Sequence, residues 1–419
     1  MRLHRLEIHN YKSLRNVAIE PTPLSVFVGP NAAGKTNLAD AIDFLGHAYS
    51  WDLERAVAYK GGYENICFRD MDKSKESIRF RVIFEVPQKR RFKEGRFVAE
   101  PLLVEHSFEF RGGSRRVQAP YTIKSEKLIF FRKNFKGGGF QETRRFFRTG
   151  RKVEANDHIT GEEALKEPGT DLKELCPLMP SLLPRRSRDF MLSWDDTLRA
   201  IFEKRLGSLR VFQLDSQSCR ESGVPTSDTG LDRSGRNLPV ALDNLKKEHP
   251  KVYSLVLEMA RKVMPTLESI ETDWTHTHSL ALFLKERGVR RHWSSQEVSV
   301  GTLQTIAILV AVLSPGTSLV VIEEPENSIH PWGLRNLVEA FRIASEKKQI
   351  MLTTHSPILI DQLSPEEVWV VQKPGTETKI DPLLSLDSSL KESWGQGKFT
   401  LSEYLDSGAV PQAVPAAGS

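Results

Sequence analysis

The sequence of 419 residues has few of the features that mark secreted or metal-stabilised proteins. Its three cysteines, Cys67, Cys176 and Cys219, lie far apart and form neither a Cys-x-x-Cys pair nor a cluster with histidine. This argues against a disulfide framework and against a zinc site. We therefore expect reduced thiols in a cytoplasmic protein.

Long apolar runs are also missing. The most apolar stretch, residues 303–322, is broken by Ser314, Pro315 and Gly316, and so falls short of the roughly 20 residues that a membrane span needs. Residues 1–6 alternate like a strand and lack the apolar centre of a signal peptide. We expect neither membrane insertion nor secretion.

The charge is nearly balanced overall but not along the chain. Lys plus Arg is 59 and Asp plus Glu is 54, a net charge of +5. Residues 86–160 contain 18 basic and 8 acidic residues, which is +10, so the remainder sums to −5. A basic block on a mildly acidic body is expected when one region meets a polyanion.

Strand-like and helix-like runs alternate, which predicts a mostly parallel α/β sheet. The continuous apolar runs at residues 319–322 and 350–353 are typical of strands covered on both faces. Helical periodicity predicts a helix at residues 303–313 and two helices within 237–263, split at Pro250.

Residues 78–86 and 102–110 are expected to be strands of a sheet. From 86 to about 205 the pattern is otherwise irregular, basic and glycine-rich. An amphipathic helix is expected near residues 140–148. The chain shows no internal repeats, and no heptad pattern long enough for a coiled coil.

A phosphate-binding loop is predicted at residues 29–36, Gly-Pro-Asn-Ala-Ala-Gly-Lys-Thr, between an expected strand and helix. Glycines let backbone N–H groups converge on phosphates, and the helix N-terminus adds its positive dipole end. Lys35 would reach the β- and γ-phosphates and Thr36 would take Mg²⁺. We therefore expect ATP and Mg²⁺ as ligands.

Two acids follow the apolar strand at 319–322. The carboxyl ends of parallel strands share one edge of a sheet, so Glu323 and Glu324 are expected beside the phosphate loop. Glu323 would hold Mg²⁺, directly or through water, and Glu324 would polarise the attacking water. An acidic turn facing solvent is the alternative.

His355 follows the second buried strand. A lone histidine there is more often structural, but beside both phosphate motifs we expect it to contact the γ-phosphate or the attacking water.

These three landmarks resemble the ABC-type ATPases, and among them the RecF/SMC/OLD-like branch. The resemblance covers residues 1–86 and 209–410. Residues 6–14 resemble the branch's opening motif, whose basic residue, here Lys12, lies near the adenine. Residues 323–331 match its Walker B motif and D-loop, and residues 402–409 resemble the close of stand-alone ATPases often found in prokaryotic anti-phage systems.

Residues 28–38 match the phosphate loop of the branch, and this implies nucleotide contacts along the segment. The residues concerned are Asn31, Ala32, Ala33, Gly34, Lys35, Thr36 and Asn37.

The resemblance also implies a signature motif at residues 298–302, in which Ser299 and Gly301 fit and would meet the γ-phosphate of a second subunit in trans. Val300 and Thr302 depart from the commoner Ser-Gly-Gly-Gln. Glu323 stands where aspartate is usual, and its extra methylene shifts the carboxylate, so the contact with the metal is expected either directly or through water. The resemblance also implies a glutamine that senses Mg²⁺; Gln213 and Gln217 are both candidates, and a surface polar role suits each at least as well. For Arg55 a solvated helix position is preferred over a contact with phosphate.

The predicted organisation has four parts. Residues 1–86 form the N-terminal lobe of an ABC-type head, 87–205 a basic insertion in place of a coiled coil, 206–410 the C-terminal lobe, and 411–419 a flexible tail.

The expected function is a Mg²⁺-dependent ATPase that forms a head-to-head homodimer, or a higher homo-oligomer, around ATP. The resemblance implies that nucleotide state is coupled to nucleic acid or to a separate nuclease or toxin in anti-phage defence. A RecF-like repair ATPase that binds gapped or branched DNA is the alternative, and a transporter ATPase is disfavoured. Acids after His355, such as Asp381, Asp387 and Glu392, are scattered, so no nuclease centre is expected there.

The basic block supplies the expected contacts to DNA or RNA. Three arginines would share one helical face and three further cations lie upstream; the alternative is a solvated face or a dock for an acidic protein. The six residues are Arg132, Lys133, Lys136, Arg144, Arg145 and Arg148.

Overall fold

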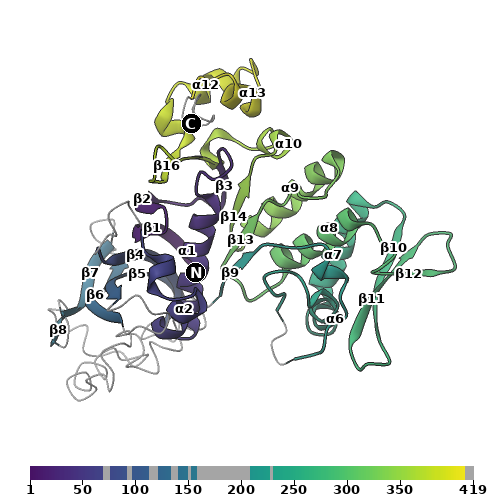
Figure 1. Ribbon diagram of the computed structural model, residues 1–419, viewed down its shortest axis with the longest axis horizontal. Helices are drawn as coiled ribbons and strands as arrows, with labels where there is room; N and C mark the ends of the chain where they lie inside the picture. The colour runs from purple at the N-terminus through teal and green to yellow at the C-terminus, as the bar shows by residue number, and fades with distance from the viewer. Residues whose placement is uncertain are drawn as a thin grey trace. The chain divides into compact units, whose positions relative to one another are not determined.

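The computed structural model describes residues 1–68, 76–91, 97–112, 121–133, 140–149, 152–157, 208–226 and 230–410. They belong to two compact units whose segments alternate along the chain (Figure 1). The first unit contains Met1–Pro21, Asp40–Leu209 and Lys373–Ile380, and the second contains Thr22–Ala39, Arg210–Gln372 and Asp381–Ser419.

A seven-stranded antiparallel sheet is the centre of the first unit, with the order β2-β1-β4-β5-β6-β7-β8. Its strands are β1 (Arg2–Tyr11), β2 (Leu14–Ile19), β4 (Ile78–Arg91), β5 (Phe97–Gly112), β6 (Tyr121–Lys133), β7 (Phe140–Thr149) and β8 (Lys152–Asp157). The associated helices are α1 (Lys35–Ser50), which begins in the second unit, α2 (Leu53–Tyr59) and α3 (Tyr63–Ile66).

Aromatic side chains fill the core of this unit. The Phe44 ring lies 5.5 Å from those of Tyr11 and Phe80, and Phe80 stacks on Phe108 at the same centroid separation. All four are fully buried. The large area that such rings remove from water stabilises the contact between α1 and the sheet.

The prediction of an amphipathic helix at residues 140–148 is wrong. The segment is strand β7, paired with β6 on one side and β8 on the other. Strand alternation places Phe146 and Arg148 on the same buried side, while Phe147 between them is exposed. Pairing with two neighbouring strands decides the structure here, because it satisfies backbone groups along both edges. The strands expected at residues 78–86 and 102–110 are confirmed within β4 and β5, whereas the irregular structure expected elsewhere after residue 86 is wrong for β6 and β8.

A six-stranded sheet organises the second unit, in the order β16-β15-β3-β14-β13-β9. Strands β15, β3, β14 and β13 are parallel, as predicted. The bounds are β3 (Leu24–Val28), β9 (Leu209–Phe212), β13 (Leu319–Glu323), β14 (Gln349–Thr354), β15 (Val368–Gln372) and β16 (Lys379–Pro382). The predicted strands at 319–322 and 350–353 are confirmed.

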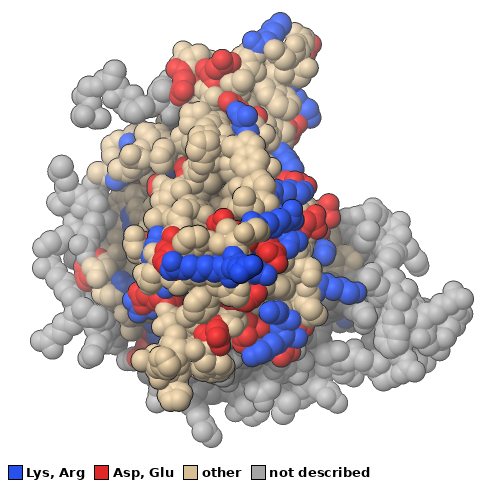
Figure 2. Space-filling model, turned by 90° about the vertical axis from the view of Figure 1, so that its right-hand side faces the viewer, with Lys and Arg blue, Asp and Glu red and all other residues tan. Residues whose placement is uncertain are grey.

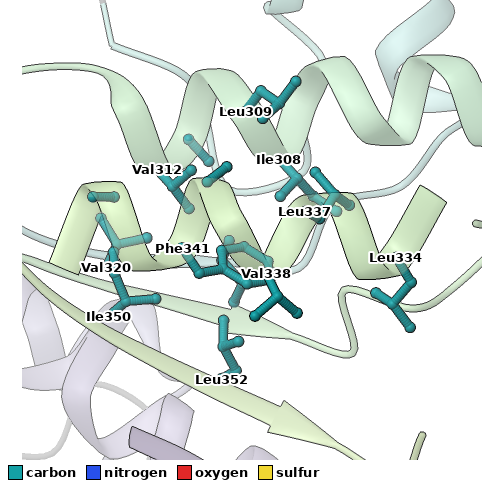
Figure 3. Close-up of a cluster of buried hydrophobic side chains, with 14 of the residues drawn as sticks. Ile308, Leu309, Val312, Val320, Leu334, Leu337, Val338, Phe341, Ile350 and Leu352 are labelled. Carbon is teal, nitrogen blue, oxygen red and sulfur yellow. The ribbon is translucent and has the colours of Figure 1, made fainter. Parts of the chain in front are cut away.

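Helices α8 (Val300–Leu313) and α9 (Pro331–Ser345) pack on this sheet and on each other (Figure 3). The contact is aliphatic, with Phe341 reaching toward the strands between Val320 and Leu352. All residues of β13 and β14 are buried. This rigid core fixes the positions at which the two strands end.

The remaining elements of the second unit include α6 (Leu238–Glu248) and α7 (Pro250–Val263), which are split at Pro250 as predicted. A small antiparallel sheet follows, with β10 (Leu267–Trp274), β11 (Leu280–Glu286) and β12 (His292–Ser294). Short elements complete it: η3 (Ser218–Arg220), α10 (Pro357–Ile360), η4 (Pro365–Glu367), α11 (Leu383–Leu386), α12 (Leu390–Gly395) and α13 (Leu401–Asp406).

Within the described ranges, no helix has the length and apolar character required to cross a membrane. Figure 2 shows one face on which blue and red side chains are intermixed. Ion pairs in the second unit include Lys285 with Glu268 at 2.8 Å and Lys262 with Glu339 at 2.7 Å.

Candidate nucleotide site

Three neighbouring parallel strands bring the predicted motifs to one edge of the sheet. The phosphate loop follows β3, Glu323 and Glu324 lie at the end of β13, and His355 follows β14, which lies between those two strands. In register, Thr354 is opposite Val28, and Thr353 is opposite Glu323. The carboxyl edge of such a sheet is where α/β folds bind ligands.

The backbone of the loop requires its glycines. Gly29 has φ 156° and Gly34 has φ 108°, values that residues with a side chain rarely adopt. A Cβ on Gly29 would also lie 2.0 Å from the carbonyl oxygen of Val371. Ala32 adopts φ 62° as well, a left-handed conformation that is unusual for alanine.

Lys35 is 6% exposed, and its ammonium group donates to the carbonyl oxygens of Gly29 at 2.7 Å and Pro30 at 2.9 Å. Burial lowers the pKa of Lys35 from its ordinary value, and the nearby charges of Glu324 and Glu326 oppose that shift. The loop thus holds a desolvated cation facing carboxylates. Of the other loop residues, Ala33 and Gly34 are buried, Asn37 is half-buried, and Asn31, Ala32 and Thr36 are exposed.

The two acids at the end of β13 lie in different environments. Glu323 is 7% exposed, and its Oε1 lies 3.3 Å from Nη2 of Arg233. The Glu324 side chain is 40% exposed, and its backbone has φ 47°. The Glu324 N–H donates to the carbonyl of Thr353 at 2.9 Å, and Asn327 donates to its carboxylate at 3.1 Å. A positive φ on a glutamate is uncommon, and such backbone strain clusters at functional sites.

Glu326 is a third acid of the site, and sequence reasoning missed it. Its Oε1 accepts hydrogen bonds from the Thr354 hydroxyl at 2.7 Å and from the His355 backbone N–H at 3.0 Å. The side chain is only 9% exposed, and its Oε2 is buried without a hydrogen-bond partner among the described residues. Glu326 therefore joins the segment after β13 to the segment after β14.

His355 faces this carboxylate. Its Nδ1 lies 3.4 Å from Oε1 of Glu326 and 4.0 Å from Oε1 of Glu324, and the imidazole is half exposed. The structure therefore brings Glu324, Glu326 and His355 together, and the charges of both acids reach Lys35.

The residues present suit the ligands that the sequence implies. Magnesium prefers oxygen donors and binds through one or two carboxylates together with phosphate oxygens. Glu323 and the Thr36 hydroxyl are oxygen donors of this kind. No cluster of three or more His, Cys, Asp or Glu able to hold a metal by itself occurs in the described part of the chain. Arg233, now paired with Glu323, is a second residue that the sequence did not reveal, because its loop has no motif.

The predicted signature segment begins a helix. The Ser299 hydroxyl caps α8, accepting from the backbone N–H of Thr302 at 3.2 Å. A Cβ on Gly301 would lie 2.5 Å from the carbonyl oxygen of Ser328, so only glycine allows this approach. The N-terminus of α8 thus contacts the segment that follows the Glu324–Glu326 acids.

The contacts described for Lys12 and Arg55 do not bring these two residues to this edge. Lys12 belongs to the first unit, where its ammonium lies 2.5 Å from Asp40, and its contact with adenine stays a prediction. Arg55 is an exposed helix residue beside Asp52. Gln213 and Gln217 are both exposed. Gln213 follows β9, and its backbone N–H donates to the carbonyl oxygen of Arg233 at 2.9 Å, which links it to the residue that pairs with Glu323.

The predicted nucleic-acid contacts need one correction. Arg148 is fully buried and pairs with Glu126 at 3.0 Å, so it is not available to phosphate. Arg145 is 42% exposed and pairs with Glu142 at 2.7 Å, and Arg132 is half-buried. Lys136, and the side chains of Lys133 and Arg144, lie outside what the structure describes.

Comparison with known families gives a clear result. The family described as "AAA domain, putative AbiEii toxin, Type IV TA system" matches residues 24–361, well over half of the chain. The chain belongs to this family. Its membership confirms the resemblance to ABC-type ATPases of the RecF/SMC-like branch, and the observed α/β architecture confirms the predicted P-loop ATPase fold.

Curated relatives match over short segments. The chain is 33% identical over 88 residues to the "DNA replication and repair protein RecF" of Lactobacillus acidophilus, which is 20% of this chain and 23% of the relative. It is 42% identical over 65 residues to the protein of the same name from Colwellia psychrerythraea, 15% of this chain and 17% of the relative. The chain thus matches less than a quarter of either relative's length.

Solved structures similar to this chain include SMC heads. An "SMC head domain from Thermotoga maritima" has a TM-score of 0.42 at 12% identity, covering 91% of this chain and 99% of the other. An "SmcHead bound to the C-winged helix domain of ScpA" has a TM-score of 0.48 at 14% identity, covering 93% and 100%.

Proposed function

We propose that this protein is a Mg²⁺-dependent ATPase of the cytoplasm that hydrolyses ATP as a dimer. The observation that carries the proposal is the arrangement of Lys35, Glu324 and His355 at one edge of a parallel sheet, where Glu326 accepts a hydrogen bond from the His355 backbone N–H. Family membership supports nucleotide binding, and it does not by itself identify a substrate or partner.

Each residue has a role that its environment allows. Lys35 would neutralise the β- and γ-phosphates, and the loop N–H groups and the start of α1 would surround them. Glu324, exposed and oriented by Asn327, would accept a proton from the attacking water. His355 would donate a hydrogen bond to the γ-phosphate. Glu323 and Thr36 would hold Mg²⁺, which supplies charge neutralisation between phosphate oxygens.

Two variants test this ATPase. Lys35→Ala should abolish ATP binding, because the main counter-charge to the phosphates is lost. Glu324→Gln should bind ATP normally and lose turnover by about 10²-fold or more, if the carboxylate is the general base. The measurements are fluorescent-nucleotide binding and phosphate release with Mg²⁺ and with excess chelator. Glu339→Gln, an exposed glutamate on α9, is the matched control. Normal turnover by Glu324→Gln would remove that residue from its role.

We further propose that the ATPase controls a separate effector in anti-phage defence. The family description, which names a type IV toxin–antitoxin system, supports this reading. A nuclease or toxin should then co-purify when the native operon is expressed, and the isolated chain should cleave neither DNA nor RNA. Cleavage by the chain alone, with Mg²⁺ and ATP, would contradict the separation of roles.

The similarity to RecF favours a second candidate, a repair ATPase that binds gapped or branched DNA. The two readings differ in partner. Repair predicts structure-specific DNA binding with ATP and no toxic neighbour, whereas defence predicts a bound effector.

A further inference from the structure

Arg220 makes an unusual set of contacts for an arginine outside any predicted motif. Its Nη1 donates to the carbonyl oxygens of Ser295 and Gln296, both at 2.7 Å, and its Nη2 donates to that of Val298 at 2.8 Å. The three carbonyls belong to the segment just before Ser299, the cap of α8. A planar guanidinium presents several N–H groups in a fixed fork, so it holds these carbonyls in one geometry.

The contact is reciprocal. The backbone carbonyl of Arg220 accepts from the Ser295 hydroxyl at 2.8 Å and from the Gln296 side-chain amide at 3.2 Å. Five hydrogen bonds therefore join one residue to the segment 295–298. We call this set of contacts the Arg220 clasp.

The residues before Arg220 are fixed in turn. Cys219 is fully buried, and Asp215 accepts from the backbone N–H of Ser218 at 2.9 Å and from its hydroxyl at 2.7 Å. The turn that follows β9 is thus tied to the core of the second unit, and it carries Arg220 at its end. The hydrogen bonds of the Arg220 clasp therefore hold the segment before α8 in a fixed position relative to that core.

The clasp lies next to the residues that one subunit of the proposed dimer would place against the nucleotide of the other. Ser299 comes one residue after the last clasped carbonyl, and Gly301 contacts the Ser328 carbonyl on the other side. The start of α8 is therefore held from both directions.

We propose that Arg220 is a positioning residue for the half-site that α8 presents to the nucleotide of a second copy of this chain. This rests on the proposed dimeric ATPase. Arg220 sets the position of Ser299 and of the first N–H groups of α8, and it does not contact the nucleotide of its own subunit.

Substitution of Arg220 should separate binding from turnover. Arg220→Ala and Arg220→Lys should bind fluorescent ATP with the wild-type affinity, because Lys35 and its loop are unchanged. Both should lose ATP hydrolysis by about 10-fold or more, since a lysine cannot reproduce the fork. Arg236→Ala is the matched control, because Arg236 is 65% exposed and its ion pair is with the exposed Glu221. ATP hydrolysis by this variant should be unchanged.

Mixing inactive variants gives the decisive test. A subunit with Lys35→Ala keeps its α8 half-site, and one with Arg220→Ala keeps its phosphate loop, so a mixed dimer contains one intact composite site. An equal mixture should regain roughly a quarter of the wild-type activity, since half of the dimers are mixed and each has one of two sites. The mixture of Lys35→Ala with Ser299→Arg is the reference and should also regain activity, because its mixed dimer likewise keeps one intact composite site.

The outcomes are distinct. Wild-type protein without ATP hydrolysis would overturn the proposed function itself. Recovery with Ser299→Arg but not with Arg220→Ala would overturn the role of Arg220 alone, as would normal hydrolysis by both Arg220 variants. No recovery in either mixture would contradict a site shared between subunits, and the proposal for Arg220 would fall with it.

Discussion

At the scale of single residues, the site depends on acids whose environments differ sharply. Glu323 is buried beside Arg233, Glu324 is exposed with a strained backbone, and Glu326 is buried against the segment after β14. The sequence predicts an acidic cluster at the end of a strand. It cannot show which of three closely spaced glutamates turns inward, because that depends on backbone angles such as the positive φ of Glu324.

We predict that Glu326 acts through His355. Glu326→Gln can still accept from Thr354 and from the His355 N–H, but it loses the negative charge beside the imidazole. ATP binding should persist while turnover falls about 10-fold, and the same change should have no further effect in a His355→Ala background, because coupled residues are non-additive. Steady-state kinetics of the two single variants and the double variant measure this coupling.

The control for that cycle is Glu339→Gln, which should be silent alone and in the His355→Ala background. Fully additive losses from Glu326→Gln and His355→Ala would mean that the two residues act independently.

At the scale of elements, prediction succeeded where one sequence pattern has one structural solution. The uninterrupted apolar runs of β13 and β14 can only be buried strands between layers, and α8 is apolar on all sides because it is covered on all sides. Strand β7 has basic and aromatic residues in pairs, a pattern compatible with the period of a helix and with that of a strand. Pairing with β6 and β8 makes this segment a strand, and a pattern within the segment itself does not reveal those partners.

The buried ion pair between Arg148 and Glu126, in the seven-stranded sheet, leads to a prediction about the free energy of unfolding. Arg148 pairs with Glu126, which also contacts the buried His106 at 3.1 Å. Arg148→Ala would remove the guanidinium that faces the buried Glu126 carboxylate, at a cost of about 3–5 kcal/mol. Arg145→Ala, which breaks a half-exposed pair with Glu142, should cost at most about 1 kcal/mol. Urea unfolding of the two variants compares them directly.

Equal stability of those two variants would contradict the buried position of Arg148.

Nucleic-acid binding by this region is tested separately, with Arg132→Glu and Arg145→Glu titrated with DNA and RNA at two salt concentrations. Phosphate contacts predict weaker binding and a shallower salt dependence.

At the scale of the whole molecule, the motifs predicted the family and the type of fold because each motif has its own local geometry. The assignment of alternating chain segments to the two units has no such local sequence signal. Thr22–Ala39, for example, belongs with residues more than 170 positions later. The predicted boundaries near 86 and 205 stay predictions.

The dimer should depend on both ATP and α8. Ser299→Arg would place a large cation at the N-terminus of α8, so it should bind ATP, remain monomeric with ATP and hydrolyse little of it. Light scattering with and without ATP, in the Glu324→Gln background that retains nucleotide, measures pairing. Ser407→Arg, at an exposed helix end, is the control. Turnover at the wild-type rate by a strictly monomeric protein would rule out the dimer as the catalytic unit.

The close approach of Gly301 to Ser328 has a thermodynamic consequence. The start of α8 and the segment after Glu326 belong to different motifs, yet a single added methyl group would force them apart. A movement of one segment on nucleotide binding therefore also moves the other, so ATP binding and subunit association are thermodynamically coupled. Such coupling is reciprocal. If ATP strengthens the affinity of two subunits for each other, the partner must strengthen the affinity for ATP by the same factor.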